Sequence, residues 1–343
     1  MAHVDDSSGD DVAVDVDADT DAQLDADALI EQAAAAIANA PLVALACHVN
    51  PDGDALGSML GMLHVLRAAG RRVVASFPTP FQVAPHYRDL PGLELLTPPD
   101  EFPPEPAVMV TFDCGSLSRL GDLEPSAKGA HDLIVIDHHV SNDRYGTINL
   151  VEPSAAASGV VVQRLVDAMH LPLCRDSAVC LYAALVCDTG RFQHETTTTE
   201  VFDFARRLTE FDVPVTSLSR VLFEEHRFAY LQLLGEALGN AHLVREQRFV
   251  WTAITQDMLE RHDVTLDEVE GLIDILRRAQ EAEVTCVLKE EDDHTFRVSL
   301  RSLGDVDVRR VAEAHGGGGH RFAAGFSSDL DLDTLIARIA AAL

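Results

Sequence analysis

The stretch HVNPDGDALGS, residues 48–58, decides both the fold and the chemistry that this sequence predicts. It follows the apolar run LVALAC (42–47), which is typical of a buried strand, and the next basic residue is Arg67. One His and two Asp therefore follow a predicted core strand with no basic side chain of the same segment beside them. Because charges next to a core need partners, we expect either a solvated loop or a bound cation here.

Composition limits the classes of partner. The 343 residues suffice for two domains, and 26 basic against 56 acidic residues give a net charge of −30. Such a charge disfavours binding along a long nucleic acid. No apolar run reaches the roughly 20 residues of a membrane span, and the N-terminus lacks a signal-peptide pattern. We therefore expect a cytoplasmic protein with no membrane segment and no long nucleic-acid partner.

The pattern along the chain predicts an α/β protein with two folded parts. Residues 1–27 hold ten Asp and no Lys or Arg, which indicates a disordered acidic tail. Over residues 28–195 short apolar strands alternate with helical segments, which predicts a doubly wound parallel sheet covered on both faces. Residues 196–235 predict a helical connector. Residues 236–343 predict a smaller α+β domain with an antiparallel sheet.

Carboxylates and imidazoles follow the predicted strands at the points where they end. Ligands of an open parallel sheet bind outside the carboxyl ends of its strands. The strand at 42–47 is followed by one imidazole and two carboxylates, and the strand at 107–112 by a single carboxylate. The strand at 132–136 is followed by the DHH triplet, and the helix LYAALVC (181–187) by a last carboxylate. The residues are His48, Asp52, Asp54, Asp113, Asp137, His138, His139 and Asp188.

These five carboxylates and three imidazoles exceed the needs of one metal ion. Like charges packed so closely raise their pKa values unless cations compensate. Mixed Asp and His donors suit manganese, iron or zinc better than magnesium alone. Two ions that share a bridging carboxylate would use the whole set, and such pairs hydrolyse phosphate esters.

The motifs resemble the DHH phosphoesterase superfamily, most closely its nanoRNase and pAp-phosphatase group. HVNPDGDALGS resembles the first motif, TFDCGSLSRLG (111–121) the second, VIDHHVSN (135–142) the third and LVCDTGRF (185–192) the fourth. VAEAHGGGGHRFAAGF (311–326) resembles the glycine-rich signature of the DHH-associated C-terminal domain. Only the acidic tail lies outside the resemblance, which also implies two divalent metal ions, manganese first, and a homodimer.

The resemblance implies a role for each motif residue. His48, Asp52 and Asp113 would hold one metal. Asp113 would bridge to a second metal that Asp54, His138 and Asp188 complete. Asp137 would ligate a metal or orient His138, and His139 would face the substrate phosphate. Further substrate contacts are expected from both lobes: Arg119, Arg301, Gly317, Gly318, Gly319, His320 and Arg321.

The predicted function is hydrolysis of short oligoribonucleotides, 3′-phosphoadenosine 5′-phosphate, or linear and cyclic di-AMP. Three alternatives stay open on sequence alone. A single-strand exonuclease resembling RecJ would want a basic groove with stacking aromatics, whereas aromatic residues are 6% of this chain. An inorganic pyrophosphatase would have no use for the GGGGH segment. A non-catalytic nucleotide sensor would be expected to have lost a motif carboxylate, and all are present.

Overall fold

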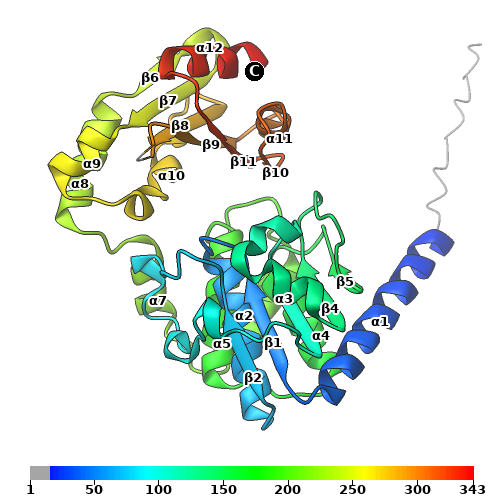
Figure 1. The fold of residues 1–343 in the computed structure, drawn as a ribbon. Coiled ribbons are helices and arrows are strands. Elements are labelled where there is room, and N and C mark those ends of the chain that lie inside the picture. Colours follow the sequence, from blue (N-terminus) through cyan, green and yellow to red (C-terminus); the bar gives the residue numbers. More distant parts are fainter. Residues whose placement is uncertain (1–15, 292) are drawn as a thin grey trace, which may run out of the picture.

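The computed structural model describes residues 16–291 and 293–343, which form two lobes (Figure 1). The N-terminal lobe is built on a five-stranded sheet and the C-terminal lobe on a six-stranded sheet. Within these described residues, no helix is both long enough and apolar enough to cross a bilayer. The acidic segment 1–15 lies outside the described residues.

The N-terminal sheet is parallel throughout, which confirms the predicted fold class. The apolar runs form its strands because their β-branched and aliphatic side chains are buried on both faces of the sheet. The strand order is β2-β1-β3-β4-β5. The strands are β1 (Val43–Cys47), β2 (Val73–Ser76), β3 (Val108–Phe112), β4 (Asp132–Asp137) and β5 (Ile148–Val151).

Alternate strand residues pack against layers on opposite faces of this sheet. Val43 and Leu45 join a large core with helices α1, α2, α4 and α5, while Ala44 and Ala46 face a smaller core beneath α3. Helices α2 and α5 lie so close that a Cβ on Gly57 would stand 2.4 Å from the Cys180 carbonyl oxygen. The helices are α1 (Val16–Asn39), α2 (Gly53–Ala68), α3 (Glu124–Gly129), α4 (Ser158–Ala168) and α5 (Arg175–Asp188).

Helix α1 corrects the expected extent of the acidic tail. It begins at Val16, so residues 16–27 are helical and the prediction of disorder is wrong for them. Between Gly9 and Pro41 the sequence contains no glycine or proline. Because extending an existing helix costs far less than nucleating one, the Ala-rich segment after Asp27 can carry the helix back into the acidic stretch.

The helices of the expected connector divide between the two lobes. Helices α6 (Thr199–Thr209) and α7 (Val215–Phe223) contribute Val201 and Leu218 to the N-terminal core. Helix α8 (Phe228–Gly239) buries Leu233 in the C-terminal core instead. The junction is therefore the short segment 224–227, which lies between α7 and α8.

The C-terminal sheet is mixed, with the order β10-β11-β9-β8-β7-β6. All neighbours are antiparallel, as expected, except β7 and β8, which are parallel and make the sheet mixed. The pair is parallel because the chain returns through α9 and α10 before it forms β8. The strands are β6 (His242–Val244), β7 (Phe249–Ile254), β8 (Val284–Glu290), β9 (Phe296–Ser302), β10 (Gly318–His320) and β11 (Ala323–Ser328); the helices are α9 (Gln256–His262), α10 (Leu272–Leu276), α11 (Val308–Glu313) and α12 (Leu332–Ala342).

Candidate metal centre

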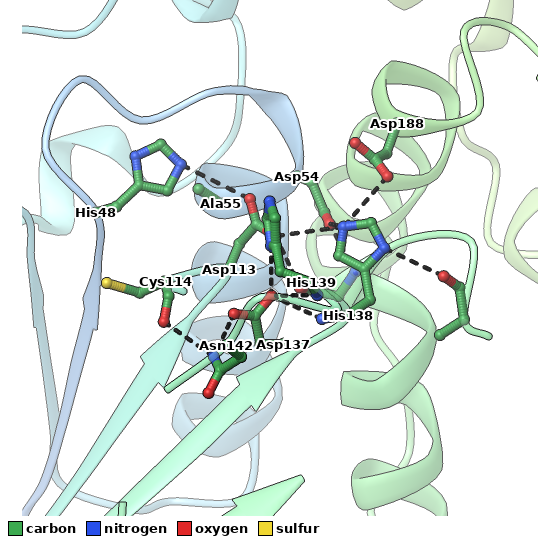
Figure 2. A network of polar contacts seen from close by, with 12 residues as sticks. His48, Asp54, Ala55, Asp113, Cys114, Asp137, His138, His139, Asn142 and Asp188 are labelled. Atoms are coloured by element: carbon green, nitrogen blue, oxygen red, sulfur yellow. Dashed lines mark hydrogen bonds and ion pairs between the residues drawn. The ribbon is translucent and has the colours of Figure 1, made fainter. Parts of the chain in front are cut away.

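The predicted site residues meet at the carboxyl edge of the N-terminal sheet, where the strand order reverses between β1 and β3. This reversal is where open α/β sheets bind ligands. His48 follows β1, Asp113 follows β3, His138 follows β4, and Asp188 ends α5. Figure 2 shows these side chains pointing toward one another from separate elements. The structure thus brings together groups that lie 140 positions apart in the sequence.

Asp113 occupies the middle of the cluster and presents its two oxygens to different imidazoles. Its Oδ2 lies 3.6 Å from Nε2 of His48. Its Oδ1 lies 3.5 Å from Nε2 of His138 and 3.5 Å from Nδ1 of His139. The residue is buried and its φ is 54°, so the backbone leaves β3 in the left-handed region to aim this carboxylate. One carboxylate therefore faces two separate groups of donor atoms.

The first group consists of His48, Asp52 and Asp113, whose donor atoms lie within 4.8 Å of one another. Asp52 caps helix α2: its Oδ1 accepts the backbone N–H groups of Asp54 and Ala55 at 3.1 and 3.0 Å. Its Oδ2 is 3.9 Å from Nε2 of His48. The helix cap thus fixes one oxygen and leaves the other directed into the group.

The second group consists of Asp54, Asp113 and His138, again with donor atoms within 4.8 Å. Asp188 adds an oxygen 3.3 Å from Nε2 of His138. Nδ1 of His138 lies 3.1 Å from the Ala155 carbonyl oxygen, which can only accept. This contact places the proton on Nδ1 and leaves Nε2 free as a donor to a metal, as in orienting contacts of metal-bound histidines.

The N-terminus of helix α4 holds the buried Asp54 carboxylate. The backbone N–H groups of Ser158 and Gly159 donate to its Oδ2 and Oδ1 at 2.6 and 3.1 Å. Ser58 donates a third hydrogen bond to Oδ1 at 2.9 Å. The positive end of a helix favours an anion at this position. Asp54 is therefore oriented by two helices: α2, which carries it and Ser58, and the start of α4.

Asp137 orients His139 more than His138. Its Oδ1 lies 2.6 Å from Nδ1 of His139 and accepts the backbone N–H groups of both histidines. Its Oδ2 accepts from Asn142 Nδ2 at 2.5 Å. Since Asp137 is fully buried and both of its oxygens are occupied, we assign it an orienting role. Asp137 was expected to ligate a metal or to orient His138. The ring that its carboxylate contacts is that of His139.

The electrostatics of the cluster are those of a cation site. Burial opposes ionisation of Asp113, but the facing His139, His48 and His138 lower the pKa of its carboxyl below the usual range. Against the effect of burial, Asp188 and Asp113 raise the pKa of His138 to about 9, and Asp113 and Asp137 raise the pKa of His139 to about 10. Burial raises the pKa of Asp188 to about 6. Without a metal, His138 and His139 take up protons, and these protons provide the positive charge.

Arg119 lies on the far side of His48 from Asp113. Its Nη2 is 3.0 Å from Nδ1 of His48, and the same Nδ1 is 2.8 Å from the Val49 carbonyl oxygen. Backbone bonding between Val49 and Arg119, at 2.9 Å, joins the two loops. Arg119 is exposed, so its guanidinium stands at the edge of the first group of donors, as expected for a phosphate contact.

The C-terminal lobe brings His320 directly against the DHH triplet. The rings of His320 and His139 are stacked with centroids 4.5 Å apart, and the His138 ring is 5.4 Å away. Glycines make this approach possible: a Cβ on Gly317 would stand 2.2 Å from the Gly325 oxygen, and Gly319 has φ of 137°. These two allow β10 to lie against β11.

Gly318, Arg321 and Arg301 were also expected to contact the substrate, and their surroundings differ. A Cβ on Gly318 would meet nothing within 4 Å, so this glycine alone of the three borders open space. The Arg321 guanidinium lies over the Phe322 ring at 5.2 Å and donates to the Asp305 carbonyl oxygen. Arg301 donates to the Leu300 carbonyl oxygen. Burial lowers the pKa of Arg301, with Asp274 and then Asp188 among the groups that oppose the shift.

Sequence reasoning missed the residues that hold the ligands in place. Ser158 donates through Oγ to Asp113 at 3.0 Å and through its backbone N–H to Asp54. Asn142 connects Asp137 to the Cys114 carbonyl oxygen, at 3.2 Å from the latter. A Ser at a predicted helix start is a common signal for a helix cap, but its direction toward two carboxylates is visible only once the fold is known.

Family models match both lobes. Residues 42–185 match the DHH family, N-terminal domain, and residues 248–343 match the DHHA1 domain. A Thermus thermophilus protein named bifunctional oligoribonuclease and PAP phosphatase NrnA is 32% identical over 299 residues, which are 86% of this chain and 87% of that relative. The chain belongs to the DHH family. The ligand groups described above come from its four N-terminal motifs.

Other relatives agree with this assignment. A Bacillus subtilis protein with the same name is 30% identical over 289 residues, which are 82% of this chain and 87% of that DHH protein. A solved structure of an exopolyphosphatase-related protein from Bacteroides fragilis has a TM-score of 0.85 at 23% identity, and covers 92% of this chain and 95% of its own. The structural likeness extends across both lobes and supports the fold. The names of the relatives support the assignment of this DHH protein as a hydrolase.

Proposed function

We propose that this protein is a metal-dependent phosphohydrolase that degrades short oligoribonucleotides and removes a phosphate from 3′-phosphoadenosine 5′-phosphate. The observation that supports it best is the position of Asp113. Its two oxygens face two donor groups from separate elements, which is the arrangement of a carboxylate shared by two metal ions. The names of the relatives supply the substrate class, since each is named for both reactions.

The donor set fits two divalent ions. His48, Asp52 and Asp113 would hold one, and Asp54, Asp113, His138 and Asp188 the other. The mixture of carboxylate and imidazole donors favours manganese over magnesium. When bound, such ions supply Lewis acidity that activates a water molecule and neutralises charge on the phosphate. Ser158 keeps Asp113 and Asp54 in fixed orientations, so that the site needs little rearrangement when metal enters.

His139 holds the substrate phosphate in this proposal. Its ring is partly exposed, at 18% of the side chain, whereas Asp137 beneath it is fully buried. The hydrogen bond to Asp137 keeps the ring cationic and fixed, so it is suited to an anionic phosphate oxygen. Arg119 provides a second positive charge at the other end of the cluster. The two side chains stand on either side of Asp113 and would hold a phosphate over it.

The C-terminal lobe selects the substrate by its length. His320 stacks on His139, so the two lobes come together at the catalytic edge itself. Gly318 next to it borders open space and leaves its backbone accessible to a phosphate. Contacts from both lobes beside one metal centre favour a substrate of a few nucleotides. The net charge of −30 disfavours a basic groove for a longer strand.

A panel assay tests the proposal. Purified protein is stripped of metal, reloaded with manganese, and offered the nucleoside bisphosphate, pApA, cyclic di-AMP, RNA of two to five residues, and pyrophosphate. We expect turnover of the first two and of the short RNA, with pyrophosphate the poorest substrate. Absence of turnover on every nucleotide, in protein shown to bind manganese, would contradict the proposal.

A further inference from the structure

Three histidines from the two lobes form a group whose donor atoms are all imidazole nitrogens. His138 and His139 follow β4, whereas His320 ends β10, which Figure 1 shows on the side of the C-terminal lobe that faces the N-terminal lobe. One ring nitrogen from each histidine lies within 4.8 Å of the other two. The other close groups of possible ligands in the described residues all contain carboxylates, so this group differs from them in its chemistry.

The two histidines of the N-terminal lobe each present one ring nitrogen to a metal. Nδ1 of His138 lies 3.1 Å from the Ala155 carbonyl oxygen, so the neutral ring has its lone pair on Nε2. Nδ1 of His139 lies 2.6 Å from Oδ1 of Asp137, which again leaves Nε2 as the donor to a metal. A carboxylate behind a histidine commonly supports a zinc ligand, because it fixes the ring and raises the basicity of the other nitrogen.

The His320 ring approaches this pair without a hydrogen bond or ion pair of its own to any described residue. Its ring plane is inclined by 47° to that of His138, and the rings of His138 and His139 are inclined by 68°. Because lone pairs lie in the ring planes, inclined rings can direct them at one point. Only the stacked pair of His320 and His139, at 24°, has to open, and His320 is the half-exposed member that can turn.

We propose that His138, His139 and His320 bind one zinc ion, and that this ion inhibits hydrolysis by joining the two lobes. Imidazole donors suit zinc, whereas manganese prefers oxygen donors. A tetrahedral zinc ion with Zn–N bonds of about 2.0–2.1 Å holds its nitrogens about 3.3 Å apart. A small shift of His320 toward the N-terminal lobe therefore completes the site. The protons on the rings of His138 and His139 pass to solvent when the ion binds.

The inhibition rests on the proposed function, because it follows from the roles of two of the zinc ligands. Zinc on Nε2 of His138 takes the imidazole away from the second donor group, which contains Asp54 and Asp113. Zinc on Nε2 of His139 occupies the nitrogen that would contact the substrate phosphate. The zinc site and the second manganese site share His138, so they cannot be complete at the same time. Zinc therefore competes with a manganese ion and with the substrate.

Zinc binding without substrate tests the site independently of hydrolysis. Metal-free protein is titrated with zinc against a chromophoric chelator. In His320→Gln the affinity should fall by more than about 10-fold, since loss of a mere orienting contact already has an effect of that size. His320→Cys should keep the affinity, because a cysteine thiolate is a zinc ligand. His242→Gln, at an exposed histidine on β6 of the same lobe, is the matched control and should bind zinc as the wild type does. Equal affinity of the wild type and His320→Gln overturns the proposal.

Inhibition of the manganese-loaded protein provides the second test. A small chromogenic phosphodiester is the substrate, and each variant is compared with its own rate without zinc. The zinc concentration for half inhibition should rise by more than about 10-fold in His320→Gln and stay near the wild-type value in His320→Cys. Unchanged inhibition of His320→Gln would place zinc in the carboxylate groups alone and overturn the proposal. Absence of hydrolysis in every variant would contradict the proposed function, while the zinc titration would still decide this site.

Discussion

Ser158 donates a hydrogen bond from Oγ to Oδ1 of Asp113 at 3.0 Å, and its backbone N–H donates to Asp54 at 2.6 Å. A single residue at the start of α4 thereby orients two of the proposed metal ligands, one on α2 and one after β3. Since both bonds are buried, neither is in competition with water. The relative position of these ligands depends on a residue that would not itself touch a metal.

The substitution Ser158→Ala should weaken metal binding without unfolding the protein. It removes the hydrogen bond to Asp113 and keeps the backbone bond to Asp54. Loss of such an orienting contact typically reduces metal affinity by about 10-fold or more. Manganese titration by calorimetry measures the change. Ser177→Ala, at another buried serine on α5, is the control and should leave the affinity unchanged.

Asp113→Ala should abolish turnover on every substrate, because it removes the carboxylate that faces both donor groups. A loss of about 4 kcal/mol in transition-state stabilisation corresponds to a rate about 10³-fold lower. Steady-state kinetics with pApA and the nucleoside bisphosphate measure the loss. Asp203→Ala, at an exposed position on α6, controls for a general effect of removing a carboxylate. A variant that keeps more than about a tenth of the wild-type rate contradicts the shared-ligand role.

Manganese affinity should rise with pH. In the metal-free protein Asp188 and Asp113 raise the pKa of His138 to about 9 against the effect of burial, so its ring is protonated at neutral pH. A metal that binds through Nε2 must displace that proton, and lower pH therefore opposes binding. The affinity should increase about tenfold per pH unit between pH 6.5 and 8.5 for this one proton. Calorimetry in two buffers of different ionisation enthalpy counts the protons released; a value near zero contradicts the assignment.

The glycine segment permits a test that separates structure from binding. A Cβ on Gly317 would stand 2.2 Å from the Gly325 oxygen, whereas one on Gly318 would meet nothing within 4 Å. Gly317→Ala should therefore lower the melting temperature and, because β10 carries His320, also raise KM for pApA. Gly318→Ala should leave the melting temperature unchanged and raise KM alone. Equal melting temperatures for the two variants would show that β10 is not held as closely as described.

Sequence patterns predicted which residues meet at the site but not which side chains orient them. His48, Asp113 and His138 could be placed because parallel strands end at a common edge, so short motifs far apart in the chain converge there. Ser158 and Asn142 could not, since their roles depend on the direction of one side chain across a packed interface. The same limit applies to Arg321, which was expected to contact substrate and whose guanidinium lies over the Phe322 ring.

The types of the secondary-structure elements could be predicted from the sequence better than their boundaries. The acidic composition of residues 16–27 favours disorder, yet helix α1 extends through them from its Ala-rich part. The connector was expected as one unit, but α7 and α8 bury their apolar faces in different cores. Local pattern shows that a helix is amphipathic; it does not show which of two lobes receives the apolar face.

The efficiency of hydrolysis should fall steeply with the length of the RNA. The rings of His139 and His320 are stacked 4.5 Å apart, so the two lobes meet at the metal centre. An extended strand covers several ångström per nucleotide, and only a few nucleotides fit between contacts on both lobes. A longer strand would need a basic exit groove to neutralise its phosphates, which a chain of net charge −30 does not favour.

We therefore expect kcat/KM to be highest for RNA of two or three residues and to drop strongly by about ten residues, with duplexes not cut at all. The measurement is a series of 5′-labelled RNA from dimer to 24-mer with manganese at fixed salt. His320→Ala provides the internal check: it should reduce kcat/KM for the dimer and flatten the dependence on length, because it removes the contact on the second lobe. Equal efficiency of the wild type on a dimer and a 24-mer would instead favour an exonuclease that follows a long single strand.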